Sequence, residues 1–208
     1  KPTFIALSAT IANPAELCEE LVGAPFTLID DNGAPQAEKA FVFYNPPVVN
    51  AELGIRRSVI KEAQRVAMRF LGAGLQTIVF ARTRIRVEVL TTYLKREMER
   101  LGRDPAVVRG YRGGYRPTDR RANDAGIPTG EGLGVVTTHA LEMGIDIGAL
   151  RVAVLAGYPG SIASTWQQGG RAGRKDAPSL VVLVGSSEPV AQCIINNPHY
   201  FYGASPEL

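Results

Sequence analysis

The chain has 208 residues, of which 45% are hydrophobic and 21% charged, and a formal net charge of +3. This composition is sufficient for one sizeable core and predicts a soluble α/β protein with one domain plus an appendage. It excludes a bilayer-spanning helix, since no apolar run approaches the roughly 20 residues required. With no signal-peptide pattern at the start, we expect a cytoplasmic protein without membrane contacts.

The first 30 residues contain one expected strand and one expected helix. An apolar strand is expected from Phe4. In the helix that follows, Asn13 is the expected N-cap and Pro14 the first residue, because a fixed φ suits that position. Glu16 is expected to complete a capping box with Asn13, and Gly23 to end the helix.

Residues 31–53 form a looser region, which we interpret as a connector with short strands of its own. Residues 31–33 are Asp-Asn-Gly, a turn composition. Residues 41–44 are apolar and aromatic, and two prolines at 46 and 47 end the strand that they predict.

From residue 54 onward, helix and strand patterns alternate. Apolar residues recur at three- to four-residue spacing over 54–72, which predicts a helix of about five turns. Residues 76–81 form a short run rich in β-branched side chains, which is typical of a strand buried on both faces. Thr83 is the expected N-cap of a second long helix that ends at Gly102.

Four more strands are predicted, over residues 106–108, 133–138, 151–156 and 180–185. Strands that alternate with helices in this way indicate a mostly parallel sheet with helices on both faces. The sequence therefore predicts an α/β fold.

The cysteines and histidines show no ligand spacing. Cys18 and Cys193 lie far apart without a CxxC motif, so we expect two buried thiols and neither a disulfide nor a metal site. His139 and His199 have no partners at metal-ligand or catalytic-triad spacing and are interpreted as structural or exposed.

Polar and glycine residues follow most of the predicted strands. Because ligands bind beyond the carboxyl ends of parallel strands, we expect all of these residues to gather at one edge of the sheet. Arginines crowd residues 103–121, which indicates an anionic partner or, equally, a solvated face. Structural alternatives stay open: Thr83 caps a helix whatever it binds, Gly114 can shape a turn, and Asp146 can cap one.

The segment QQGGRAGR, residues 167–174, is the least ordinary part of the chain. Each of its three glycines is unfavourable inside a helix by about 1 kcal/mol relative to alanine. Their presence around Arg171 and Arg174 predicts that the backbone approaches something closely. The guanidinium fork suits phosphate oxygens and stays charged at any working pH.

These segments resemble a known family. SAT (residues 8–10), IVFARTR (78–84), VVTTHALEMGIDIG (135–148) and QQGGRAGR stand in the order and spacing of motifs III, IV, V and VI of superfamily 2 helicases. The resemblance covers essentially the whole chain, and motifs V and VI together are its most specific part. It implies a RecA-like fold.

The resemblance also divides the chain. Residues 1–30 would be the end of a first RecA-like domain, residues 31–53 the connector, and residues 54–208 the second RecA-like domain. Ser8 and Thr10 of motif III would link ATP state to the interface between the two domains. SATIANPAEL and YNPPVVN further resemble the DEAD/DEAH-box helicases of DNA-crosslink repair that carry a C-terminal zinc-binding, DUF1998-type region, which implies DNA as the nucleic acid.

The resemblance implies a role for each matching position. Arg171 and Arg174 would be arginine fingers, and Gln167 would help to place them. Gly144 and Asp146 would face the nucleotide. The residues that would hold the nucleic-acid backbone are Thr83, Arg84, Arg109, Arg112, Gly114 and Thr138. His139 departs from the family pattern, in which Asn or Asp is frequent.

The sequence contains no G-x-x-x-x-G-K-[ST] phosphate loop and no strand followed by an Asp-Glu pair. ATP and Mg²⁺ would therefore be held mainly by the N-terminal RecA-like domain of the same parent chain, and this fragment alone is predicted to be inactive. One alternative is a stand-alone α/β module that binds nucleic acid without motor activity. A phosphate-binding metabolic enzyme is the other, but no acid, base or nucleophile cluster supports it.

Overall fold

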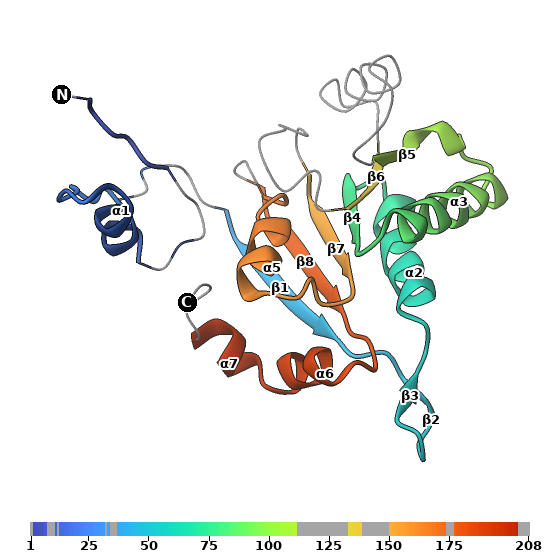
Figure 1. The fold of residues 1–208 in the computed structure, drawn as a ribbon. Coiled ribbons are helices and arrows are strands. Elements are labelled where there is room, and N and C mark those ends of the chain that lie inside the picture. Colours follow the sequence, from blue (N-terminus) through green and yellow to red (C-terminus); the bar gives the residue numbers. More distant parts are fainter. Residues whose placement is uncertain are drawn as a thin grey trace.

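The computed structural model describes residues 2–7, 11, 13–31, 33, 37–111, 133–138, 150–173 and 177–203. A six-stranded sheet organises the fold, in the order β1-β8-β7-β4-β6-β5 (Figure 1). All of its strand pairs are parallel, which confirms the predicted sheet. Its strands are β1 (Lys39–Tyr44), β4 (Thr77–Ala81), β5 (Val108–Tyr111), β6 (Gly134–Thr137), β7 (Val152–Ala156) and β8 (Ser179–Val184).

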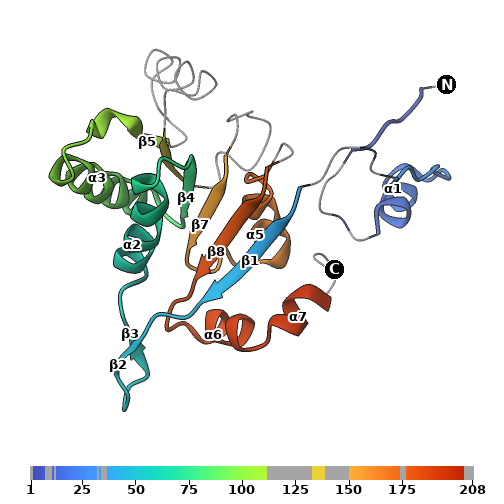
Figure 2. The same ribbon diagram turned by 180° about the vertical axis from the view of Figure 1, so that it is seen from behind.

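The strands alternate their side chains between two hydrophobic cores, as the period of two requires. One core joins Val79 and Val154 to the helices α2 (Val59–Gly72) and α3 (Arg84–Arg100). The other core lies on the opposite face, which further helices cover (Figures 1 and 2). These are α5 (Ile162–Gly169), α6 (Pro189–Asn196) and α7 (Pro198–Gly203).

The long helices show where periodicity succeeds. The predicted stripe of α3 is buried at Val87, Leu90, Leu94 and Met98, while Leu101 beyond the helix end is exposed. In contrast, α2 begins at Val59 and not at the predicted residue 54. The reason is that residues 55–56 form strand β3 (Ile55–Arg56), which pairs antiparallel with β2 (Val48–Asn50) as a hairpin.

Strand β1 lies in the segment that we predicted as a connector. It pairs with β8 along its whole length, so the sheet of the domain begins before residue 54. Its aromatic side chains pack against aromatic residues of α5 and α7, which lie far along the chain. Ring-to-ring distances of 5.0–6.5 Å connect a cluster of five residues, namely Phe41, Phe43, Trp166, Phe201 and Tyr202.

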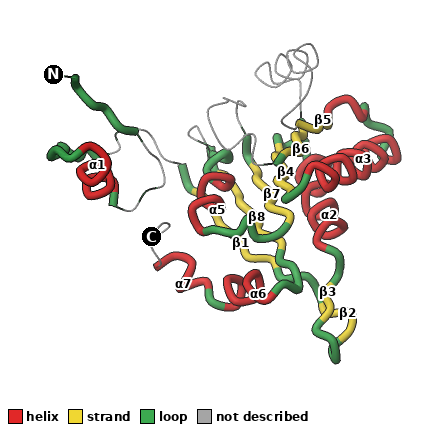
Figure 3. Tube along the Cα trace, viewed as in Figure 1, coloured by secondary structure: helices red, strands yellow, loops and turns green. Residues whose placement is uncertain are grey.

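The N-terminal segment lies apart from the sheet (Figure 3). Helix α1 (Pro14–Val22) is confirmed, with Gly23 at φ +70° as its C-cap. The predicted capping box is wrong, since the Asn13 side chain makes no cap hydrogen bond and its Nδ2 donates to Glu16 instead (3.1 Å). The strand expected from Phe4 is also wrong: residues 2–7 are exposed and unpaired, because no neighbouring strand supplies backbone partners.

The prediction of two buried thiols is wrong as well. Both cysteines are free, but Cys18 is only half-buried and Cys193 is exposed. Helix α1 has no buried residue at all, so Cys18 has no core to enter. Cys193 occupies the outer face of α6, whose buried residues are Ala191, Ile194 and Ile195.

Candidate functional site

The carboxyl ends of the strands form one edge of the sheet, here called the carboxyl edge. Arg82 and Thr83 follow β4, and Thr138 follows β6 directly. Strands β4 and β6 are hydrogen-bonded neighbours, so the two threonines belong to the same part of this edge. The structure therefore brings Thr83 and Thr138 to the same edge, as the sequence predicts, while their contact with nucleic acid stays a prediction.

Thr83 has the predicted structural role. Its backbone is extended, and its Oγ1 accepts a hydrogen bond from the Arg86 N–H (3.3 Å), which caps α3. Arg84 is the first residue of that helix and is exposed. Arg84 adds its positive charge at the N-terminus of α3, which also carries the positive end of the helix dipole. This end of the helix therefore favours an anion.

Arg109 and Gly110 lie inside strand β5 and not in a loop after it. Arg109 is half-buried and stands in register with Val135. A Cβ on Gly110 would lie 2.8 Å from Thr91 Oγ1, so the glycine allows α3 to pack closely on β5. Sequence analysis missed this packing role, because it depends on Thr91, which lies 19 positions earlier on α3.

The arginine segment does not lie at the carboxyl edge, which corrects the prediction of a single polar edge. Helix α5 leaves the carboxyl end of β7 and carries the chain back across the sheet. Beyond it, the Gly173 N–H donates to the Leu150 carbonyl (3.0 Å), just before β7 begins. Residues 170–173, here called the arginine loop, therefore lie at the opposite, amino edge, with Arg171 half-buried within them.

The three glycines of this segment are explained by packing within the chain. A Cβ on Gly169 would lie 3.2 Å from Val181, and one on Gly170 would lie 3.0 Å from the Trp166 carbonyl. Gly173 has φ +83°, and its Cβ would overlap Ser179 Oγ. The backbone does approach something closely, as predicted, but in the described residues the close neighbours are strand β8 and the end of helix α5.

The structure describes some of the predicted site residues and not others. Gln167 and Arg171 are described: both are half-buried, and Gln167 belongs to α5. The predicted residues that fall outside are Ser8, Thr10, Arg112, Gly114, Gly144, Asp146 and Arg174, together with His139 and the middle of the turn at 31–33.

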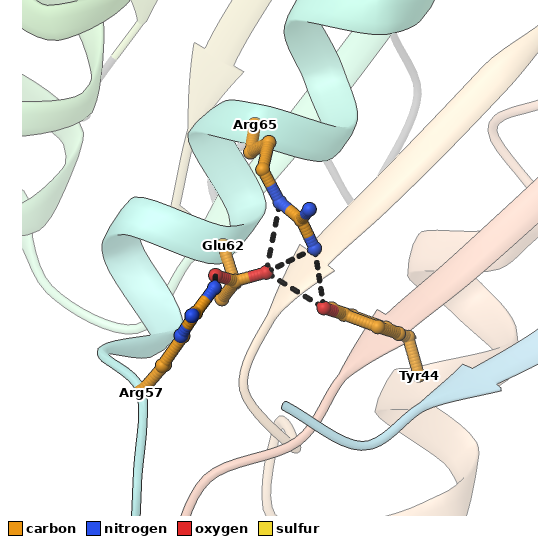
Figure 4. Close-up of polar contacts among 4 residues, drawn as sticks. All are labelled: Tyr44, Arg57, Glu62 and Arg65. Carbon is orange, nitrogen blue, oxygen red and sulfur yellow. Dashed lines mark hydrogen bonds and ion pairs between the residues drawn. The ribbon is translucent and has the colours of Figure 1, made fainter. Parts of the chain in front are cut away.

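An ionic cluster that sequence analysis missed lies where β1 meets α2 (Figure 4). Glu62 on α2 has a side chain only 5% exposed. Its Oε2 accepts hydrogen bonds from the Tyr44 hydroxyl (2.7 Å) and from Arg65 Nε (3.0 Å) and Nη2 (2.6 Å), and Arg57 Nη1 lies 3.8 Å from Oε1. The only sequence signal was a carboxylate in a helix stripe with arginines nearby.

These contacts set the charge state of the cluster. Burial alone would raise the pKa of Glu62, but the hydrogen bonds from Tyr44 and Arg65 and the charges of both arginines outweigh it and lower that pKa. The hydrogen bond to Glu62, followed by burial, raises the pKa of Tyr44. A carboxylate with a lowered pKa stabilises the fold above its ordinary pKa and loses this effect as pH falls through the lower folded value.

We therefore expect Glu62→Gln to reduce the free energy of unfolding at pH 7 by about 1–3 kcal/mol, a moderate value because Arg65 is half-exposed. The difference from wild type should shrink as pH is lowered through the acidic range. Urea unfolding at a series of pH values measures both. An exposed counterpart, Glu99→Gln on α3, is the control, and a Glu62→Gln effect that does not change with pH would contradict the assignment.

The described part of the chain contains neither a cluster of metal ligands nor a helix that could span a membrane. Within those residues, no group of three His, Cys, Asp or Glu side chains comes together as a metal site would. Over the same residues, no helix combines the length and the apolar character needed to cross a bilayer.

The chain is similar to known helicases. The helicase conserved C-terminal domain matches residues 62–176. The ATP-dependent helicase YprA of Bacillus subtilis (strain 168) is 53% identical over 206 residues, which are 99% of this chain and 27% of YprA. The DUF1998 helicase MrfA, solved bound to DNA and bound to DNA and AMPPNP, gives TM-scores of 0.89 and 0.88 at 53% and 52% identity.

Coverage limits what these similarities describe. The aligned part is 96% of this chain but only 27% and 28% of the two MrfA chains, so the present chain spans about a quarter of the length of YprA and MrfA. Dbp5 of Saccharomyces cerevisiae, bound to RNA and ADP BeF3, aligns over 94% of this chain and 48% of its own, with a TM-score of 0.66 at 19% identity. That level of identity shows the fold alone, and the fold is RecA-like.

The family match covers more than half of the chain, and the parallel sheet is that of the matching structures. The chain therefore belongs to the helicase conserved C-terminal domain family and is the C-terminal RecA-like domain of a superfamily 2 helicase.

Proposed function

We propose that this chain is the C-terminal motor domain of an ATP-dependent DNA helicase. The observation that carries the proposal is the separation of two polar sites on one sheet: Thr83, Arg84 and Thr138 at the carboxyl edge, and Arg171 at the amino edge. The strands between them are buried on both faces, and packed interiors transmit displacement because they are barely compressible. A movement imposed at one edge therefore reaches the other.

The carboxyl edge would hold the nucleic-acid backbone. Hydroxyls, backbone N–H groups and arginines are the groups that contact phosphates, and they position a strand without reading its sequence. Exposed Arg84 at the start of α3 and Thr138 beside β4 supply such groups. Contacts of this kind do not distinguish DNA from RNA. The preference for DNA is supported by MrfA, a close relative in sequence, which was solved bound to DNA.

The amino edge would meet the nucleotide. ATP, when bound, supplies a transferable γ-phosphoryl group on which negative charge develops. Arg171 and Arg174 would each aim a guanidinium fork at phosphate oxygens, and Gln167 would help to place them. Lys39 adds a cation here, since its Cε lies 3.3 Å from where a Gly173 Cβ would stand. This donor set fits phosphate and not Mg²⁺, which takes oxygen ligands and would be held by the N-terminal RecA-like domain.

The two RecA-like domains would work as a pair. Closure around nucleotide brings the arginine loop to the phosphates, and reopening withdraws it while the strand grip shifts along the backbone. Gly144 and Asp146 would face the nucleotide from this domain, and Ser8 and Thr10 would couple the nucleotide state to the interface. These residues would all act at a nucleotide site that needs both RecA-like domains to be complete.

The proposal predicts that the 208-residue chain alone hydrolyses ATP no faster than buffer, because it lacks the phosphate loop. The parent protein should hydrolyse ATP in a reaction stimulated by single-stranded DNA more than by RNA. Phosphate release with each polymer measures both. The same assay tests the alternative of a binding module, which requires a parent that binds DNA in a salt-sensitive way but neither hydrolyses ATP nor changes its DNA affinity with AMPPNP.

Robust hydrolysis by the fragment itself would contradict the shared-site interpretation. A parent stimulated by RNA and not by DNA would keep the motor assignment and overturn the choice of polymer.

A further inference from the structure

The β2–β3 hairpin projects away from the six-stranded sheet (Figure 1). It follows β1, precedes α2 and extends beyond the rest of the ribbon in both Figure 1 and Figure 2. Its two short strands pair only with each other, as a separate two-stranded sheet. Nothing in the packing of the six-stranded sheet requires a projection of this kind.

The hairpin presents apolar side chains to solvent. Leu53 is 71% exposed and Val49 60% exposed, and Val48 and Ile55 are exposed beside them. Glu52 is the single acidic residue of 48–57, whereas two arginines close that segment. Because these apolar side chains are not buried, they do not stabilise the fold. Clustered on a projecting element, they indicate contact with another molecule.

The root of the hairpin is firmly held. The Arg57 N–H donates to the Pro47 carbonyl (2.9 Å), which closes the base of the hairpin. The Arg56 N–H donates to Ser187 Oγ (3.0 Å), and Arg56 Nη1 donates to the Pro46 carbonyl (2.7 Å). Near the tip, the Leu53 N–H donates to Asn50 Oδ1 (2.9 Å). The apolar tip is therefore held at a fixed place relative to the sheet.

That place adjoins the proposed strand-binding edge. Ser187, which holds Arg56, lies just beyond the carboxyl end of β8. The next residue, Glu188, forms an ion pair with Arg82 (2.6 Å), and Arg82 precedes Thr83. The chain of contacts thus leads from the hairpin root to the residues proposed to hold the nucleic-acid backbone.

We propose that the hairpin is a strand-separating wedge, which seats Leu53 and Val49 against the terminal base pair of a duplex. The guanidinium groups of Arg56 and Arg57 have further N–H donors beyond their contacts with Pro46 and Glu62, and these face the phosphates at the fork. This inference rests on the proposed function. Its physical basis is that apolar side chains inserted at a base step unstack it, and that arginines compensate phosphate charge. An apolar tip above a basic root matches the bases and phosphates of a fork.

The test uses the parent protein, a forked duplex DNA and the double substitution Val49→Ser with Leu53→Ser. Both side chains are exposed, so the fold should persist. We expect unwinding to slow by about tenfold, while ATP hydrolysis stimulated by single-stranded DNA stays within about twofold of wild type. Leu101→Ser is the matched control, since Leu101 is 48% exposed and lies beyond the far end of α3, away from the hairpin and its root contacts.

A second measurement is independent of the motor. With 2-aminopurine in the terminal base pair, binding of the wild-type parent without ATP should raise the fluorescence, and the double variant should raise it less. Unchanged unwinding, or unwinding and hydrolysis that fall together, would overturn the wedge, and the second result would assign the hairpin to contacts between domains. A wild-type parent that unstacks the fork but lacks hydrolysis would overturn the motor and leave the wedge.

Discussion

Arg174→Ala is expected to lower the rate of DNA-stimulated ATP hydrolysis by the parent helicase by about 10³-fold or more. The reason is electrostatic: a guanidinium aimed at the transferring phosphoryl group stabilises charge that is larger in the transition state than in the ground state, so its loss falls on kcat. Arg174→Lys should recover little of the rate, because an ammonium lacks the fork that matches two phosphate oxygens. Steady-state kinetics with saturating single-stranded DNA measure kcat and KM separately.

The matched control is Arg96→Ala, an exposed arginine of α3. It should leave hydrolysis unchanged, and DNA binding should survive in both variants because the proposed strand contacts lie at the carboxyl edge. Arg171→Ala should show a loss of the same kind, and the double variant a loss smaller than the product of the two, since the pair acts on one group. If Arg174→Ala kept most of the turnover, the finger assignment would be wrong.

Phe201→Ala is expected to reduce the free energy of unfolding by about 3–5 kcal/mol, the usual range for a buried phenylalanine. Phe201 is fully buried, and its ring lies 5.0 Å from that of Trp166 and 5.2–5.3 Å from those of Phe43 and Phe41. The Phe201 ring thus packs between α7, α5 and the edge strand β1. Its removal would leave a cavity that these three elements cannot fill by moving closer. Urea unfolding followed by circular dichroism measures the change.

Tyr200→Ala supplies the comparison, because Tyr200 sits on the same short helix with 60% of its surface exposed. Its substitution should change the unfolding free energy by about 0.5 kcal/mol or less. Equal losses for the two variants would mean that α7 contributes through its helix alone and not through the aromatic cluster.

Several features that depend on neighbouring residues in the sequence were predicted correctly. The stripe of α3, the capping by Thr83 and the doubly buried β4 all followed from spacing and residue type, and all are present. The strand expected from Phe4 failed because a strand exists only beside another strand, and pairing is a long-range property. For the same reason, nothing in residues 39–44 revealed that β1 joins β8.

The position of the arginine loop was mispredicted for a different reason. Residues after β7 were assigned to the carboxyl edge, although a helix between parallel strands must run back to the amino edge. The eight residues of α5 make that return, and the loop after them meets Leu150. The buried Glu62 could not have been placed either, because its partner Tyr44 lies 18 residues earlier.

The pairing of β1 with β8 also affects synthesis of the domain. Lys39 stands in register with Ser179, 140 residues later (179 − 39), so this edge of the sheet cannot form until almost all of the domain has left the ribosome. At about 5–20 residues per second, the interval is on the order of 10 s. During that time Phe41 and Phe43 lack their partners on α7 and β8, so the nascent edge strand exposes aromatic side chains that a chaperone would have to protect.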